Sequence, residues 1–285
     1  MFPRYSPEAT KALRLSNRQF KKLFGVTKSS FYKLLKILRA ADAARHKFGG
    51  RPSRIPLENK LLWTLQYWRE YRTMEHLAYE YGTVVSHIHD EIVWIENVLI
   101  QDGTFRLPGK KVLQNSNSPY QTVAVDATEH PIERPPKKQE DWYSGKKKQH
   151  TIKTQLVICL VTLTIICLVQ AEGKVHDFQL FKDDLGKSLS EDILVKGDSG
   201  YQGIEHWHKN SRIPIKKPKD GELLELEKAY NRRLSRKRVA IEHVNRTIKT
   251  FRILKDRYRN RCQRHDIRVA LICAIVNDER TNNKA

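Results

Sequence analysis

Cysteine is scarce in this chain of 285 residues, which contains four. None belongs to a C-x-x-C pair, and no histidine cluster accompanies them at the spacing of a zinc site. This pattern argues against a structural zinc motif and is typical of thiols in a reducing compartment. We expect buried thiols at Cys159, Cys167, Cys262 and Cys273.

The sequence also lacks long apolar runs. Its first residues, Met1-Phe-Pro-Arg-Tyr, contain no apolar signal core. The longest apolar run, Leu156 to Val169, is too short to span a bilayer, and its β-branched residues favour a sheet. We therefore expect a cytoplasmic protein with no membrane partner.

Acidic residues are few beside the basic ones, 32 Asp and Glu against 53 Lys and Arg, for a net charge of +21. The excess lies in residues 1–60 and 228–261, and the rest of the chain is nearly neutral. Charge this concentrated indicates a polyanion as partner, with DNA or RNA ahead of a membrane surface.

Two apolar, β-branched stretches each end in a single aspartate. The stretch from Thr122 carries Asp126, and the stretch from Ile193 carries Asp198. Both are typical of short buried strands. Because a carboxylate is costly to bury unless it is paired or binds a cation, the pattern predicts two carboxylates brought together at a sheet edge.

A third acid, Glu242, lies in a strongly basic helical stretch whose apolar residues recur at 3-4-3 spacing. At about 100° per residue, Arg238, Glu242 and Lys249 fall within about 40° of one another, away from the apolar stripe. The simplest interpretation is an i,i+4 ion pair between Arg238 and Glu242, worth a few tenths of a kcal/mol. Together with the two strand-end aspartates, we favour a third converging carboxylate.

The N-terminal part is helical. Residues 14–41 predict two amphipathic helices with a basic face, which either stays solvated or contacts DNA or a second copy. Residues 47–56 are a linker by their Gly and Pro content. Within it, Gly50-Arg51-Pro52 resembles an arginine hook for the minor groove, although a three-residue match is weak and a plain basic linker is the favoured explanation.

Residues 57–100 predict a helix-turn-helix. Ala78, Gly82 and Ile88 have the small–glycine–aliphatic spacing that packs two helices across a tight turn. The residues expected to face a DNA groove are Thr83, Ser86, His87 and His89. Against this, the second helix continues with the acids Asp90, Glu91 and Glu96, which would repel phosphate, so a purely structural helix pair stays open.

From Thr122 onward, strands alternate with helices. Thr151–Val169 predicts two strands without a recognisable turn, with a buried helix as the alternative. A helix at 178–185, strands at 193–197 and 212–216, and helices over about 221–281 follow. This order predicts an α/β fold. We expect a basic helical region at 1–46, the linker at 47–56, a helix-turn-helix region at 57–118 and a catalytic domain at 119–285.

These motifs together resemble those of the insertion-sequence transposases with an Asp-Asp-Glu (DDE) triad, specifically the IS-five-like branch. Gly197-Asp198-Ser-Gly-Tyr201 is similar to the family's second-aspartate motif, and Val125-Asp126-Ala-Thr to its first. Arg238, Glu242 and Lys249 have the spacing of the third, although Ser235 stands where the family has tyrosine.

The resemblance implies a ribonuclease-H-like catalytic domain, with a mixed five-stranded sheet, behind an all-α helix-turn-helix region. It implies that Asp126, Asp198 and Glu242 hold two Mg²⁺ ions, with Mn²⁺ as a substitute, for cleavage and transfer of DNA strands. It also implies double-stranded DNA partners (transposon ends and target), a homodimer or larger assembly on DNA, and a nucleoid-associated prokaryotic protein. DNA-backbone contacts are expected from Arg238, Arg246, Lys249, Lys146, Lys147, Lys148 and Arg51.

Some interpretations remain open. His176 and Asp177 suit a helix start better than a metal pair, His150 suits a strand face, and Lys146 to Lys148 suit a solvated loop as well as a DNA contact. The alternatives to a transposase are a catalytically silent DNA-binding regulator and a ribonuclease-H-like nuclease.

Overall fold

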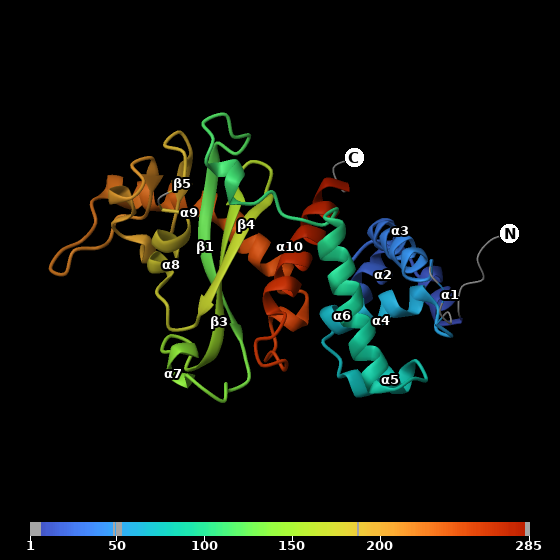
Figure 1. Ribbon diagram of the computed structural model, residues 1–285. Coiled ribbons are helices and arrows are strands. Elements are labelled where there is room, and N and C mark those ends of the chain that lie inside the picture. The colour runs from blue at the N-terminus through green and yellow to red at the C-terminus, as the bar shows by residue number, and fades with distance from the viewer. Residues whose placement is uncertain (1–6, 48, 50–52, 187, 283–285) are drawn as a thin grey trace. The chain divides into compact units, whose positions relative to one another are not determined.

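The computed structural model describes residues 7–47, 49, 53–186 and 188–282. The chain forms two compact units (Figure 1). The helical unit comprises Met1–Arg106, Ile248–Asp256 and Arg264–Ala285, and the sheet unit comprises Leu107–Thr247 and Arg257–Gln263. The chain therefore enters the sheet unit from the helical unit and afterwards returns to it. Within the described residues, no helix is long and apolar enough to cross a membrane.

The helical unit is built from α1 (Pro7–Arg14), α2 (Asn17–Phe24), α3 (Lys28–Arg45), α4 (Leu57–Arg69), α5 (Met74–Glu80), α6 (Val85–Asp102), η4 (Arg252–Leu254) and α10 (His265–Asn282). Gly25 ends α2 in the left-handed conformation, with φ of 81°, which separates the two helices predicted there. The helical stretch expected over 221–281 is interrupted between residues 248 and 265.

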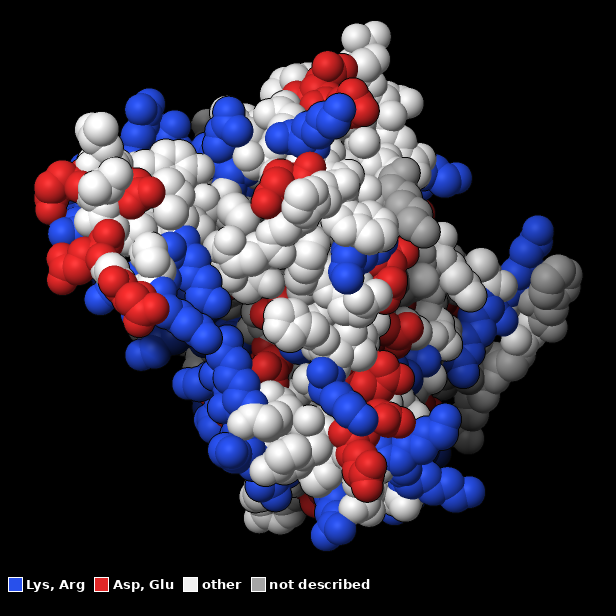
Figure 2. All heavy atoms as spheres, turned by 90° about the vertical axis from the view of Figure 1, so that its left-hand side faces the viewer, with Lys and Arg blue, Asp and Glu red and all other residues white. Residues whose placement is uncertain are grey.

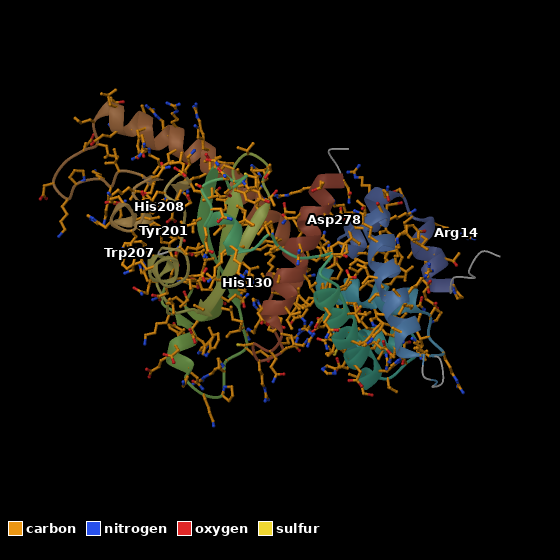
Figure 3. The ribbon with its side chains drawn as sticks, turned by 45° about the horizontal axis from the view of Figure 1, so that its top comes forward. Arg14, His130, Tyr201, Trp207, His208 and Asp278 are labelled. Atoms are coloured by element: carbon orange, nitrogen blue, oxygen red, sulfur yellow. The ribbon has the colours of Figure 1, made fainter. Side chains whose placement is uncertain are left out.

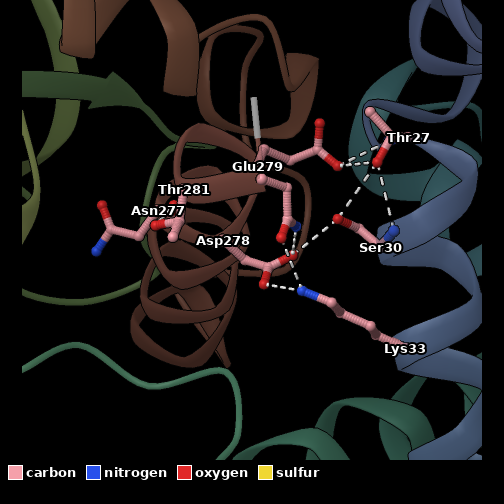
Figure 4. Close-up of polar contacts among 8 residues, drawn as sticks. Thr27, Ser30, Lys33, Asn277, Asp278, Glu279 and Thr281 are labelled. Atoms are coloured by element: carbon pink, nitrogen blue, oxygen red, sulfur yellow. Dashed lines mark hydrogen bonds and ion pairs between the residues drawn. The ribbon is translucent and has the colours of Figure 1, made fainter. Parts of the chain in front are cut away.

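The last helix, α10, is connected to the first ones by partly buried polar contacts (Figure 4). The Glu279 carboxylate accepts hydrogen bonds from the Thr27 amide at 2.7 Å and from Lys21 at 2.6 Å. Asp278 accepts from Ser30 at 2.8 Å and pairs with Lys33 at 2.6 Å. Residues more than 240 positions apart thus close one helical core, and α10 packs there although it falls within the range expected for the catalytic domain.

The sheet unit contains β1 (Thr122–Pro131), β2 (Tyr143–Ser144), β3 (Gln149–Cys159), β4 (Ile165–Glu172), β5 (Leu194–Lys196) and β6 (Ser211–Arg212). The helical elements of the unit are η1 (Lys110–Leu113), α7 (Gln139–Trp142), α8 (Asp177–Asp184), η2 (Ser199–Tyr201), η3 (Ile204–His206) and α9 (Glu225–Ile248).

The sheet is mixed. β3 pairs antiparallel with β1, β2 and β4, whereas β5 pairs in parallel with β1 and β6. The path β4-β3-β1-β5-β6 puts β1 in the centre, and the short β2 beside β3 makes six strands where five were predicted. The ribonuclease-H-like fold class is confirmed. The edge strand β6 ends at Arg212, just before Pro214, which cannot donate to a ladder.

β3 and β4 form the predicted hairpin, so the buried-helix alternative is wrong. The turn uses none of the usual turn residues. Leu163 adopts a left-handed φ of 60°, the Thr162 and Thr164 hydroxyls bond each other at 2.8 Å, and Leu163 N–H donates to the Cys159 carbonyl. Cys159 and Cys167 flank this turn as buried free thiols; Cys273 is also buried, and Cys262 only partly.

Side-chain alternation along β1 sorts its residues between two faces. Val123 and Val125 join the main core with Val195, Phe181 and the other buried residues beside α8. Asp126 must then point to the opposite face, and there it contacts α9. The sheet unit therefore has one apolar face under α8 and one face, under α9, that carries a carboxylate.

Candidate active site

The parallel pairing of β1 with β5 brings the two predicted aspartates to neighbouring positions. Val123 pairs with Val195 and Ala124 with Lys196, so the strands run side by side towards Asp126 and Asp198, which are close enough for the charge of Asp198 to act on Asp126. Asp198 lies just past β5, where its Oδ1 accepts a hydrogen bond from the Gly200 amide at 2.8 Å. The local turn thus holds the second carboxylate at the end of the strand.

Asp126 is held from α9 by two side chains. Asn245 Nδ2 donates to Asp126 Oδ2 at 2.8 Å, and Arg238 Nη2 lies 4.0 Å from Oδ1. Burial raises the pKa of Asp126 to about 6, Arg238 opposes the shift, and the charges of Asp198 and Asp177 add to it. Its carboxylate is therefore under-compensated, as expected of a group that binds a cation.

Sequence reasoning missed Asn245, although a signal was present. It lies seven positions after Arg238, so both lie within about 20° on one face of α9. Asn245 Oδ1 is buried and has no hydrogen-bond partner. An orphaned amide oxygen beside a desolvated carboxylate is a suitable donor for a hard cation.

Glu242 is not brought to the aspartates. Its side chain is exposed on α9, three residues before Asn245. Among the described residues, no group of three acid, histidine or cysteine side chains is close enough to hold a metal ion. The structure thus assembles Asp126 with Asp198 and leaves the third carboxylate a prediction.

A cavity of about 410 Å³ opens beside Asp198, with Glu129, Lys146 and Asp177 among its lining residues. Asp177, the first residue of α8, forms an ion pair with the buried Lys153 at 2.6 Å. Lys146 to Lys148 are exposed between β2 and β3, and His150 packs edge-on against Tyr143.

Tyr201 is fully buried in the core of the sheet unit beside α8 (Figure 3). Its hydroxyl accepts a hydrogen bond from Gln155 at 2.9 Å, and Gln155 also donates to the Asp177 carbonyl at 3.0 Å. Burial and the nearby charges of Asp177, Asp126 and Asp198 raise the pKa of Tyr201 well above its ordinary value. It therefore stays a neutral phenol that supports the site from the core.

The helical unit contains the predicted helix-turn-helix as α5 and α6. Gly82 makes the turn with φ of 61°. Ser86 is exposed, whereas His87 is held between the Thr83 hydroxyl at 3.0 Å and Glu91 at 3.5 Å. Arg51 lies outside the described residues.

Two of the acids that argued against a DNA contact do not face solvent. Glu91 is buried against Lys60 at 2.8 Å. Glu96 is fully buried and binds Arg264 at 2.5 Å and Arg268 at 2.6 Å. Only Asp90 remains exposed, so the repulsion expected from the second helix is largely removed.

The expected backbone-contacting cations lie in different settings. Arg246 is exposed on α9, and Lys249 follows the end of that helix as part of the helical unit. In the view of Figure 2, Lys and Arg side chains form a band along the left-hand side. Phosphate contacts by these residues stay a prediction.

Comparisons with known proteins agree with this geometry. Residues 125–277 match the family described as DDE superfamily endonuclease, and residues 53–105 match the helix-turn-helix of DDE superfamily endonuclease. A protein of Microchaete diplosiphon, named as a probable transposase for insertion sequence element IS702, is 45% identical over 94% of this chain and 97% of its own length. A protein of Streptomyces albus G, named as a putative transposase for insertion sequence element IS112, is 25% identical over 81% of this chain and 84% of its own length.

Proposed function

The chain belongs to the DDE superfamily endonucleases, and on that premise we propose that it is the transposase of an insertion sequence, which binds the terminal inverted repeats and catalyses strand cleavage and strand transfer. The observation that supports the proposal is the parallel pairing of β1, which carries Asp126, with β5, which leads into Asp198. The helix-turn-helix of the same superfamily, on the same chain, supports DNA as the substrate.

Endonucleases of this superfamily use divalent metal ions, and the residues present fit such ions. Two adjacent carboxylates and the orphaned Asn245 oxygen are the oxygen donors that Mg²⁺ prefers. We propose that Asp126, Asp198 and Glu242 hold two Mg²⁺ ions, which Mn²⁺ replaces. When bound, the metal supplies Lewis-acid activation of the attacking and leaving oxygens at a phosphate.

The chain's own residues bind and orient the substrate. Asn245 and Arg238 fix the Asp126 carboxylate, and the turn at Gly200 fixes Asp198. Arg246, Lys249 and Lys146 to Lys148 contact the DNA backbone, which positions the strand without reading its sequence. Glu242 shares α9 with both Asp126 contacts, which supports it as the third carboxylate. Two ends must be held together for transfer, so we propose a homodimer on DNA.

The test is cleavage of a labelled duplex that carries the element's terminal inverted repeat, in Mg²⁺ or Mn²⁺. We expect metal-dependent nicking at the element boundary by the wild type and none by Asp126→Asn or Asp198→Asn. Asp192→Asn is the matched control, because Asp192 is exposed and lies shortly before β5. Repeat binding without cutting would favour a silent regulator, and cutting that survives Asp198→Asn would refute the assignment of that carboxylate.

A further inference from the structure

A cavity of about 210 Å³ lies between β5, β6 and α9 in the sheet unit, apart from the cavity beside Asp198. Four cations line it: Lys196 from β5, Arg212 at the end of β6, and Arg233 with Lys237 from α9. The ring of Tyr230 completes one wall, with its hydroxyl 3.3 Å from the Ile213 carbonyl. No acid is among the lining residues.

Lys196 is the unusual member of this group. Its residue is only 6% exposed, yet no carboxylate among the described residues pairs with it. Burial and the charges of Lys237 and Arg233 lower its pKa. A buried cation is costly unless an anion compensates it. By contrast, another buried lysine of the sheet unit, Lys153, forms an ion pair with Asp177 at 2.6 Å.

The cavity also has a fixed relation to the aspartates. Lys196 pairs with Ala124, so its side chain lies on the Asp126 face of the sheet, two residues before Asp198. Arg233 and Lys237 stand one turn apart on the helix that contacts Asp126 through Arg238 and Asn245. At 1.5 Å per residue, the midpoints of these two sets lie about 10 Å apart along the helix axis.

We propose that this cavity binds one backbone phosphate of the DNA strand whose scissile phosphate lies at Asp126 and Asp198. This deepens the proposed function and rests on it. Because consecutive nucleotides of one strand advance about 3.4 Å along the duplex axis, a separation of about 10 Å places the bound phosphate within about three nucleotides of the cut. Lys196 and Arg233 supply charge-assisted contacts to it, and the contact fixes the register of the strand rather than its sequence.

The experiment measures binding of terminal-repeat duplexes in which single phosphates are replaced, one position at a time, by a neutral methylphosphonate. For the wild type we expect about tenfold weaker binding at one position, the loss typical of one charged hydrogen bond. Lys196→Met and Arg233→Gln should bind that duplex and the unmodified one equally. Arg236→Gln is the matched control, because Arg236 is equally exposed on α9 but does not line the cavity.

Each other outcome overturns the proposal. If both variants still discriminate at that position, or if no position near the boundary discriminates, the cavity holds no DNA phosphate. If inorganic phosphate raises the Tm of the wild type but not of Lys196→Met while DNA discrimination is unchanged, the cavity takes free phosphate instead. Because binding is measured without cleavage, failure of the endonuclease proposal would appear separately, as wild-type protein that does not nick the repeat.

Discussion

Replacing Glu96 by glutamine tests whether α10 is an integral part of the DNA-binding helical unit. Glu96 is fully buried on α6. Its Oε1 accepts a hydrogen bond from Arg268 on α10, and its Oε2 accepts one from Arg264, the residue just before α10. Trp68 Nε1 also donates to Oε1, at 3.2 Å. Glutamine keeps the volume and an acceptor oxygen but removes the charge. The Arg268 guanidinium, on a residue only 2% exposed, then faces a neutral amide in place of a carboxylate.

Breaking a buried ion pair in this way costs about 3–5 kcal/mol. We expect the urea midpoint to fall accordingly and Tm to drop by about 10 °C or more. Circular dichroism and tryptophan fluorescence report the unfolding, and repeat binding should vanish at temperatures that leave the wild type active and return on cooling.

The matched control is Asp256→Asn in the same unit, which breaks the exposed Arg252 pair at 2.9 Å. That change should cost less than about 1 kcal/mol. A loss from Glu96→Gln no larger than the control's would refute the reasoning. The double replacement Glu96→Met with Arg268→Leu should recover much of the stability, because apolar side chains do not need the missing partner.

Three further predictions concern single groups. Asn245→Ala removes the hydrogen bond to Asp126, worth about 1.5–3 kcal/mol, so the pKa of Asp126 and the acidic limb of the cleavage pH profile should rise by about one to two units; an unshifted profile would contradict the contact. The pKa of Asp126 is raised to about 6 in the folded protein, so the folded state keeps this proton to a higher pH than the unfolded state does. The metal-free wild type should therefore lose stability in urea titrations as the pH rises from 4 to 6, and Asp126→Asn should lose less. His265 has a pKa lowered to about 4 by burial, so the unfolded state takes up its proton first and stability should fall as pH drops from about 6.5 towards 4; a similar fall in His265→Gln would assign it to other groups.

The strand pattern predicted β1 and β5 because side-chain period and burial are local properties. The expected strand end at Asp126 was wrong, because β1 runs on to Pro131, whereas Asp198 does lie just past the end of β5. The hairpin between β3 and β4 was predicted, but its turn was not, because Leu163 carries no intrinsic preference for its left-handed backbone.

The sequence alone could not predict which residues far apart in the chain form ion pairs. Glu96 was read as a repulsive surface acid because its partner Arg268 is 172 residues away. Asn245 carries no charge and so gives a weaker signal than Glu242, although its position relative to Arg238 can be calculated from the helical period. Lys196 in an apolar strand was also a visible signal, since a lysine there must either reach solvent or meet an anion.

The return of the chain to its first unit has a consequence for synthesis on the ribosome. α6 leaves the ribosome early, but the arginines that neutralise Glu96 follow only after the entire sheet unit has been translated. At 5–20 residues per second, that interval is about 10 to 30 s. The nascent protein therefore completes its DNA-binding unit only when the aspartate strands already exist. A product truncated by a stop codon or frameshift within the sheet unit would lack a stable helical unit too, and would not occupy the DNA ends in competition with intact protein.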